Sequence, residues 1–347
     1  MKIAQVAPLY ESVPPHGYGG TERVVSYLTD ELVRIGEDVT LFASGDSRTK
    51  AKLIPACSRS LRLDKSVDTL SHHIVMLEQV FQRANEFEII HFHVDYLHFP
   101  LSRRSTVTQT TTLHGRLDLA DLPPLYHEFT DMPLVSISNA QRQPLAFANW
   151  IGTVHHGLPP SLFTFNQNPD DYLVFLGRIS PEKRVDRAID IAKRTGRKLK
   201  IAAKIDPHDR YYFNKHIKPL LDDPLVEYQG EIGEAEKNEL LGNACALLFP
   251  IDWPEPFGLV MIETLACGTP VIAFRCGSVP EVITEGLTGF IVDDIDQAVA
   301  AVKKLANIDR GRCRQEFEIR FTDQRMAHDY MKVYKRLLTQ DKHREAA

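Results

Sequence analysis

The sequence predicts an α/β protein made of two doubly wound domains, each built on a parallel sheet. Short apolar, strand-like runs alternate with helix-like runs along the chain, which is typical of βαβ units. The length of 347 residues exceeds that of one ordinary core and suits two domains. A segment rich in Pro, Asn, Gln and Asp, residues 158–170, indicates a boundary between them.

In the first half, the first strand-like run is nearly continuous in apolar character, as expected of a strand covered on both faces. The first lies at residues 2–7, and a helix opened by Gly19 and Gly20 and ended by Gly36 follows it. A second helix is expected at residues 69–84. Further strands are expected at residues 39–43, 88–92, 105–111, 134–138 and 152–154.

The second half has the same rhythm. Its first strand is expected at residues 172–176, and Ser180 is expected to cap the next helix, with Pro181 in the first helical position. Further strands are expected at residues 199–203, 226–229, 246–249, 271–273 and 290–292.

The last stretch, residues 324–340, has the apolar stripe of one long helix, which we expect to pack back onto the first domain. The domains are therefore expected at residues 1–160 and 170–323, with the crossing helix in residues 324–347.

Composition excludes several classes of protein. The formal net charge of −5 gives no sign of nucleic-acid binding. The five cysteines are scattered, with no C-x-x-C pair, which favours reduced thiols in a cytoplasmic protein over disulfides or a zinc site.

The sequence also bears on membrane contact. The N-terminal apolar run ends at Pro8, which favours a first strand over a signal peptide. No apolar run approaches the roughly 20 residues of a membrane span. Peripheral membrane contact stays open, because a short basic amphipathic face would suffice for it. Oligomeric state is not defined by the sequence.

The segment EPFGLVMIE, residues 255–263, follows the strand expected at 246–249 and is expected to open a helix. Glu255 lies in the turn before that helix, and Glu263 lies about two turns further on. Backbone N–H groups in such a turn receive oxygen atoms, and a helix N-terminus favours negative charge. The segment can therefore hold a polyhydroxylated, anionic ligand; the alternative is an ordinary turn flanked by two surface glutamates.

Two cations follow the strand expected at residues 172–176. Arg178 comes just after it, and Lys183 is expected in the first turn of the next helix. A cation there is unfavourable for the helix dipole, which indicates a ligand that offsets the cost. Guanidinium and ammonium groups both stabilise phosphoryl oxygens. A diphosphate between Arg178 and Lys183 is therefore expected; the alternative is a solvated basic patch.

The first half offers weaker signals. Gly19 and Gly20 before a helix let the backbone approach a phosphate, although such pairs also simply make turns. His114, in TLHG after a strand, suits a polar contact to a reacting group, and a histidine bonded inside its own loop is the alternative. His91 and His93 alternate on a strand as metal ligands do, but no third ligand has a convincing spacing, so no metal is expected.

The motifs together resemble those of the family-4 retaining glycosyltransferases, which have the GT-B fold. The resemblance spans residues 1 to about 334. The segments that carry it, besides EPFGLVMIE, are GYGGTERVV, TLHG, SISNAQR, HHGLP, GRISPEKRVD, CGTPVIAF and GSVPEVI.

The resemblance implies two Rossmann-like domains facing across a cleft, with a nucleotide diphosphate sugar held mostly by the second. Glu263 would accept hydrogen bonds from the ribose, and Glu255 would face the donor sugar. Arg178 and Lys183 would hold the diphosphate, completed by Gly19 and Gly20, and His114 would lie near the sugar and the acceptor. The backbone N–H groups of Phe257, Gly258 and Leu259 would meet sugar and phosphate oxygens, and the base would lie near Glu231, Ile232 and Lys204.

The activity implied is metal-independent, retaining transfer of a hexose, with UDP-glucose the favoured donor and no cofactor required. The alternatives are a GDP-mannose-dependent mannosyltransferase, a nucleotide-sugar epimerase or hydrolase on the same fold, and a non-catalytic sensor. The acceptor would contact His16, Asp95 and Arg116. It would be a small molecule, a lipid-linked molecule or a polysaccharide, which the sequence does not distinguish.

Overall fold

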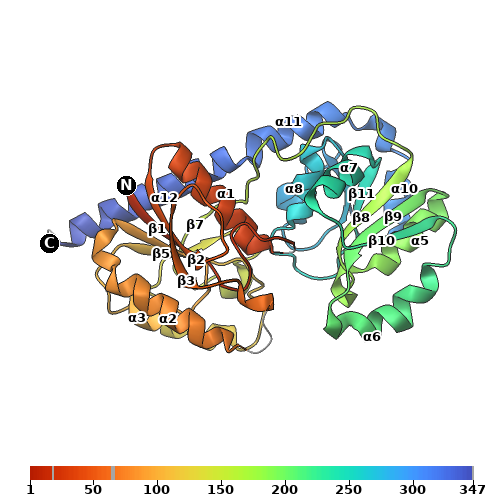
Figure 1. Cartoon of the computed structure of the whole chain (residues 1–347). Helices are drawn as coiled ribbons and strands as arrows, with labels where there is room; N and C mark the ends of the chain where they lie inside the picture. The colour runs from red at the N-terminus through yellow and green to blue at the C-terminus, as the bar shows by residue number, and fades with distance from the viewer. Residues whose placement is uncertain (18, 64–66, 346–347) are drawn as a thin grey trace. The chain divides into compact units, whose positions relative to one another are not determined.

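A computed structural model describes residues 1–17, 19–63 and 67–345 of the chain. Contacts divide the chain into two compact units, one made of Met1–Pro159 with Asp323–Ala347 and the other of Pro160–Thr322. Each unit carries its own sheet with helices around it (Figure 1). Tyr18, within the GYGGTERVV segment, lies outside the described residues.

The first unit is built on a parallel sheet with the strand order β3-β2-β1-β4-β5-β6-β7 in the described residues. The strands are β1 Lys2–Val6, β2 Asp38–Ser44, β3 Lys52–Cys57, β4 Ile89–Phe92, β5 Gln109–Thr112, β6 Leu134–Ser136 and β7 Trp150–Thr153. Its helices are α1 Gly20–Arg34, α2 Thr69–Gln82, α3 Phe99–Ser102, α4 Leu122–Glu128 and α12 Asp323–Glu345.

Two strands of this sheet depart from the sequence-based expectation. The strand expected at residues 105–111 begins only at Gln109, because Ser105 turns back to donate its N–H to the carbonyl of Ser102. The edge strand β3 was not expected, since its sequence KLIPAC contains a proline and is only partly buried. Proline is tolerated at a sheet edge, where one side of the strand needs no N–H donor.

The second unit is built on a parallel sheet with the order β10-β9-β8-β11-β12-β13 in the described residues. The strands are β8 Tyr172–Arg178, β9 Lys198–Lys204, β10 Val226–Gly230, β11 Ala246–Phe249, β12 Val271–Phe274 and β13 Gly289–Val292. Its helices are α5 Val185–Thr195, α6 Arg210–Tyr212, α7 Glu234–Asn243, α8 Leu259–Ala266, α9 Val279–Val282, α10 Ile295–Val302 and α11 Arg310–Arg320. The predicted strand at 246–249 is confirmed in full.

The expected start of the helix after β8 is right only in part. Ser180 and Pro181 take the N-cap and first positions of a separate 3-10 turn, Pro181–Lys183, and the side chain of Ser180 makes no capping hydrogen bond. The α-helix begins only at Val185, after Arg184 in a left-handed conformation. Lys183 is therefore outside the first turn of α5, and the helix-dipole argument for a ligand does not apply to it.

The long helix α12 belongs to the first unit, where it packs against α1. Its apolar stripe is buried and includes Met326, Tyr330, Tyr334 and Leu337. Tyr334 accepts a hydrogen bond from Gln5 of β1 at 3.1 Å. The last helix thus closes the core of the unit in which the chain begins. No helix among the described residues is both long enough and apolar enough to cross a membrane.

The core of the first unit contains buried histidines, which is unusual because burial disfavours a titratable ring. Burial lowers the pKa of each of them, that of His98 to about 3. His98 bonds to the hydroxyls of Ser102 at 2.5 Å and Thr111 at 2.8 Å. These buried histidines are His73, His91, His93, His98 and His156.

Acid is therefore expected to destabilise the first unit. Below about pH 6.5 the unfolded chain protonates these histidines while the folded unit keeps them neutral, so the unfolded state binds more protons and the free energy of unfolding falls. Each histidine contributes at most about 1.4 kcal/mol per pH unit. Urea unfolding of a Trp253→Phe variant, which leaves Trp150 of the first unit as the only tryptophan, should show this between about pH 7.5 and 5.5.

The matched control is His98→Gln in the same background. It keeps a polar side chain beside Ser102 and Thr111 but removes one titrating group, so its stability should depend less steeply on pH. A free energy of unfolding that is constant over this pH range would contradict the account.

Candidate active site

The carboxyl ends of neighbouring parallel strands meet at one edge of the second sheet, where ligands of open α/β sheets bind. Arg178 ends β8 and Lys204 ends β9, and the two residues are paired in register. Glu231 and Ile232 follow β10 directly, with Glu231 exposed. This edge therefore brings together Arg178, Lys204 and the loop expected to meet the base.

Lys183 forms an ion pair with Glu255 at this edge. Its Nζ pairs with Oε2 of the carboxylate, which also accepts a hydrogen bond from Nε1 of Trp253 at 3.1 Å. The ammonium lies 4.9 Å from the ring centroid of Trp253 and 5.7 Å from that of Phe249. The side chains of Lys183 and Glu255 are only 20% and 12% exposed. Two residues predicted from separate motifs are thus in direct contact, in a partly desolvated setting.

Arg178 is surrounded by carboxylates. Its guanidinium donates to Glu182 at 2.6 Å and to Asp206 at 3.4 Å, and lies 3.6 Å from Asp209. Nζ of Lys204 lies 3.4 Å from Asp206 as well. The cations expected to hold a diphosphate are therefore paired with carboxylates in the absence of a ligand. Sequence reasoning found the cations but not these acidic partners, two of which lie on the loop after β9.

The EPFGLVMIE segment forms a tight turn before α8, which begins at Leu259. Gly258 has a φ of 77°, a left-handed conformation that glycine adopts without strain. The carbonyl of Phe257 accepts a hydrogen bond from Oγ of Ser278 at 2.8 Å, and that of Glu255 accepts one from the N–H of Ser278 at 3.0 Å. The turn is therefore anchored by its carbonyl groups.

Gly277 allows this close approach. A Cβ placed there would lie 2.3 Å from the carbonyl oxygen and 2.4 Å from the nitrogen of Glu255, and the φ of Gly277 is 54°. Backbone atoms cannot move aside as a flexible side chain can. The glycine of the GSVPEVI segment is therefore required for the position of Glu255, a role that sequence reasoning did not assign.

Glu263 lies in the second turn of α8 and is 5% exposed. Its Oε1 accepts a hydrogen bond from Nζ of Lys237 on α7 at 2.7 Å, and Lys237 also pairs with Glu234 at 3.2 Å. One carboxylate oxygen of Glu263 is thus fixed by Lys237, which the sequence analysis missed.

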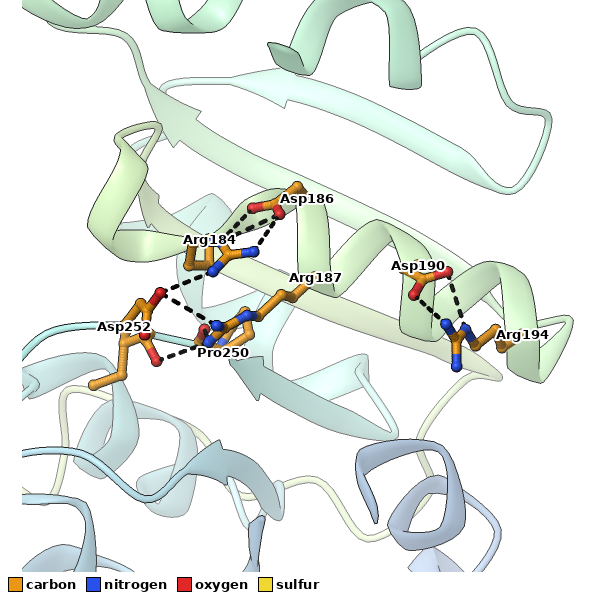
Figure 2. A network of polar contacts seen from close by, with 8 residues as sticks. Arg184, Asp186, Arg187, Asp190, Arg194, Pro250 and Asp252 are labelled. Carbon is orange, nitrogen blue, oxygen red and sulfur yellow. Dashed lines mark hydrogen bonds and ion pairs between the residues drawn. The ribbon is translucent and has the colours of Figure 1, made fainter. Parts of the chain in front are cut away.

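Arg184 supports the loop that carries Lys183. It has a φ of 52° and a ψ of 49°, which is rare for a residue with a side chain. Its guanidinium bonds to Asp186 at 2.9 Å and to Asp252 at 2.8 Å, and Asp252 also pairs with Arg187 at 3.2 Å (Figure 2). The N–H of Asp252 donates to the carbonyl of Glu182 at 2.8 Å. These contacts join the loop after β8 to the loop after β11.

In the first unit, His114 follows β5 and contacts other histidines. Its Nε2 lies 2.9 Å from Nδ1 of His93, and its ring stacks on that of His156 with centroids 5.3 Å apart. The residue keeps some exposure, but its Nδ1 is buried and has no hydrogen-bond partner among the described residues. Burial lowers the pKa of His114 to about 3, so the ring is neutral near pH 7.

Gln141 fixes the loop of His114. Its amide Nε2 donates to the carbonyls of Leu113 at 2.8 Å and Gly115 at 2.9 Å, and its Oε1 accepts from the N–H of Ile137 at 2.9 Å. The backbone on both sides of His114 is therefore held by one buried side chain. This residue lies in the SISNAQR segment but was not predicted as part of the site, because its partners are 26 and 28 positions earlier or in its own loop.

The two glycines expected to approach a phosphate have different positions. Gly20 is the first residue of α1 and is exposed, whereas Gly19 is buried against Pro15. A Cβ at Gly19 would lie 2.8 Å from Cβ of Pro15. Gly19 is therefore required by packing in its own loop, whatever its role toward a ligand.

The residues expected to contact an acceptor lie on loops of the first unit. His16 and Asp95 are exposed, and Asp95 has a φ of 50°. Arg116 is exposed and holds Asp118 through two hydrogen bonds of 2.7 Å. That contact, above all, lowers the pKa of Asp118.

The described residues contain no group of three or more His, Cys, Asp or Glu side chains that could hold a metal ion. His91 and His93, which alternate on β4 as metal ligands can, use their ring nitrogens for hydrogen bonds to protein groups. The cations described at the carboxyl edge of the second sheet, which could bind an anionic ligand, are Arg178, Lys183 and Lys204.

Comparison with known families matches residues 163–317 to the family described as "Glycosyl transferases group 1". The match lies within the second unit. Over 203 residues the chain is 30% identical to the D-inositol 3-phosphate glycosyltransferase of Mycolicibacterium smegmatis, covering 52% of this chain and 43% of that protein. The chain spans less than half the length of the curated relatives that it matches.

Solved structures extend the likeness over the whole chain. AviGT4, a glycosyltransferase involved in avilamycin A biosynthesis, matches with a TM-score of 0.77 and 24% identity over 98% of both chains. HepE from Anabaena, in complex with UDP and glucose, matches with a TM-score of 0.75 and 15% identity over 96% of this chain and 99% of that one. With its two parallel-sheet domains, the chain has the GT-B fold that its sequence predicts.

The geometry of Arg184 predicts an order of stability for two substitutions. Both Arg184→Ala and Arg184→Gly lose the ion pairs, but only alanine retains the left-handed strain, which costs about 1 kcal/mol. Arg184→Gly should therefore be more stable than Arg184→Ala, and glycine is also well tolerated at this N-cap position. Urea unfolding followed by Trp253, in a Trp150→Phe background, measures both; alanine as stable as glycine would contradict the assigned strain.

Proposed function

We propose that this chain is a retaining glycosyltransferase that moves a hexose, with glucose favoured, from a nucleotide diphosphate sugar to an acceptor hydroxyl. UDP-glucose is the favoured donor. The reaction needs no metal ion, because side-chain cations neutralise the diphosphate. The observation that carries the proposal is the cluster of Arg178, Lys183 and Lys204 with Glu255 at the carboxyl edge of the second sheet.

The chemistry of the leaving group supports these roles. Breaking the bond between the sugar and the diphosphate develops negative charge on phosphoryl oxygens, which guanidinium and ammonium groups stabilise. Arg178 and Lys183 are partly covered, so their charges are screened less than those of exposed side chains. A diphosphate would replace Glu182 and Glu255 as their partner, and the released Glu255 would face the sugar as positive charge develops on its ring.

The transfer would take place on one face of the sugar. The anomeric carbon leaves the diphosphate oxygen, the acceptor oxygen bonds to the same face, and the acceptor proton passes to the departing phosphate. Configuration is retained without a protein nucleophile. Closure of the site would exclude water and limit hydrolysis of the donor. Glu263 would accept hydrogen bonds from the ribose through its remaining oxygen, and Glu231, Ile232 and Lys204 would surround the base.

The comparisons support transfer over the alternatives. The matched family and the named relatives are glycosyltransferases, which disfavours an epimerase. HepE, of the same fold, is known with UDP and glucose, which supports UDP-glucose over GDP-mannose. The acceptor would be a small molecule, a lipid-linked molecule or a polysaccharide bound near His16, Asp95 and Arg116. A screen of acceptor hydroxyls with the identified donor would define its class.

Nucleotide binding tests the donor class. Calorimetric titration of UDP, GDP and ADP into protein in excess EDTA should give measurable affinity for a nucleoside diphosphate, with UDP the tightest. Binding that survives EDTA follows from the use of side-chain cations in place of a metal. Tighter binding of GDP would overturn the assignment of the base and favour a mannosyltransferase. No affinity for any of the three would overturn the proposed function.

Substitution of the two cations tests the mechanism. Arg178→Ala and Lys183→Ala should each lower kcat by about 10²–10³, the effect of losing a charged contact to the transition state. Arg194→Ala is the matched control, because Arg194 lies at the far end of α5, where it pairs with Asp190 at 3.0 Å (Figure 2). Its rate should stay near wild type. Near-wild-type rates for both site variants would remove the diphosphate assignment.

A further inference from the structure

A chain of buried hydrogen bonds runs from α12 to His114 inside the first unit. Tyr334 on α12 lies 3.1 Å from Nε2 of Gln5 on β1, and Oε1 of Gln5 lies 2.8 Å from Nε2 of His93 on β4. Nδ1 of His93 then meets Nε2 of His114 at 2.9 Å. Gln5, His93 and Tyr334 are at most 2% exposed. These groups therefore exchange no hydrogen bonds with solvent, and each must be satisfied by its neighbour.

A second arm leads away from Tyr334. Its hydroxyl lies 2.7 Å from Nδ1 of His91, whose Nε2 lies 2.7 Å from Oγ1 of Thr112. Thr112 in turn meets the hydroxyl of Tyr330 at 2.9 Å. Tyr334 is thus the junction of the two arms, whereas Tyr330 lies at the end of the second arm only.

The amide of Gln5 gives the network a direction, because an amide has a donor end and an acceptor end. Its Nε2 donates to Tyr334, so its Oε1 must accept the proton of His93 Nε2. A neutral imidazole has one N–H, so Nδ1 of His93 is an acceptor and must receive the proton on Nε2 of His114. Nδ1 of His114 then carries a lone pair, and it is the buried nitrogen that has no partner among the described residues.

We propose that Gln5 and Tyr334 are positioning residues, which hold His114 in the tautomer with its proton on Nε2 and thereby leave Nδ1 to accept a hydrogen bond from a hydroxyl group of a bound sugar. The inference rests on the proposed function, since it assigns the ligand of His114 as a sugar. It also gives α12 a role in the reaction, because the helix supplies the hydroxyl that accepts the hydrogen bond of the amide.

Burial supports the proposal in two ways. It lowers the pKa of His93 and His114, so both rings remain neutral and each keeps one acceptor nitrogen. Burial also means that these groups can bond only to one another, so the alternative is a hydrogen-bond chain that runs in the opposite direction. Reversal of the Gln5 amide would reverse the proton between His93 and His114, and Nδ1 of His114 would become an N–H donor instead of an acceptor. The two directions predict opposite chemistry toward a hydroxyl group.

The test uses protein labelled with ¹⁵N in histidine, whose long-range ¹H–¹⁵N correlations tell a protonated ring nitrogen from a bare one. His114 is identified by the signals lost in a His114→Asn variant. Wild-type protein should show a protonated Nε2 and a bare Nδ1 on His114. A proton on Nδ1 would overturn the proposal, and the only variant that this measurement requires is the His114→Asn protein used for assignment.

Two matched substitutions on α12 then separate positioning from general packing. Tyr334→Phe and Tyr330→Phe each remove one buried hydroxyl, but only the first removes the acceptor of Gln5. Tyr334→Phe should give a mixture of His114 tautomers and lower kcat about tenfold with little change in the KM for the donor, as loss of an outer partner does elsewhere. Tyr330→Phe should keep the wild-type tautomer and a kcat within about twofold of wild type.

The outcomes keep the two proposals apart. An unchanged tautomer and an unchanged kcat in Tyr334→Phe, or equal losses in both variants, would overturn the role of Gln5 and Tyr334. The predicted tautomers in wild type and both variants, with no sugar transfer from any nucleotide diphosphate sugar, would instead overturn the proposed function and leave the assigned direction of the network intact.

Discussion

The ion pair between Lys183 and Glu255 is the interaction on which the rest of the second unit's site depends. It joins the loop after β8 to the turn before α8, and the aromatic rings of Phe249 and Trp253 keep it partly out of water. An opposite charge within contact distance offsets part of the cost of taking two ionised groups out of water. The pair therefore holds a cation at the carboxyl edge of the sheet, where the proposed diphosphate would compete for it.

Gly277 and the strained backbone of Arg184 both serve to position the ion pair between Lys183 and Glu255. Gly277 lets a second loop approach the backbone of Glu255 to a distance that any side chain would prevent. Arg184 adopts a left-handed conformation directly after Lys183, and its bonds to Asp186 and Asp252 offset that strain. In the first unit the constraint is different, because neutral, buried histidines are ordered by hydrogen bonds and not by charge.

The sequence predicted the alternation of strands and helices and the edge at which polar residues gather, because apolar periodicity and turn residues are local signals. The strand at 246–249 follows from them, whereas the contact between Lys183 and Glu255 joins residues 72 positions apart and was not predicted. The edge strand β3 and the start of α5 were missed, since a proline and a left-handed arginine contradict local preference. Lys237 and Gln141 could not be predicted, because their roles arise from contacts between segments far apart in the chain or from a folded loop.

The central claim is that Arg178 and Lys183 exchange their carboxylate partners for the diphosphate of a nucleotide sugar. A crystal structure of the protein with UDP, grown without divalent ions, tests it most directly. The account predicts phosphate oxygens within hydrogen-bond distance of Nζ of Lys183 and of the guanidinium of Arg178, with Glu255 released from Lys183. A nucleotide bound elsewhere, or a diphosphate that leaves the ion pair between Lys183 and Glu255 intact, would contradict it.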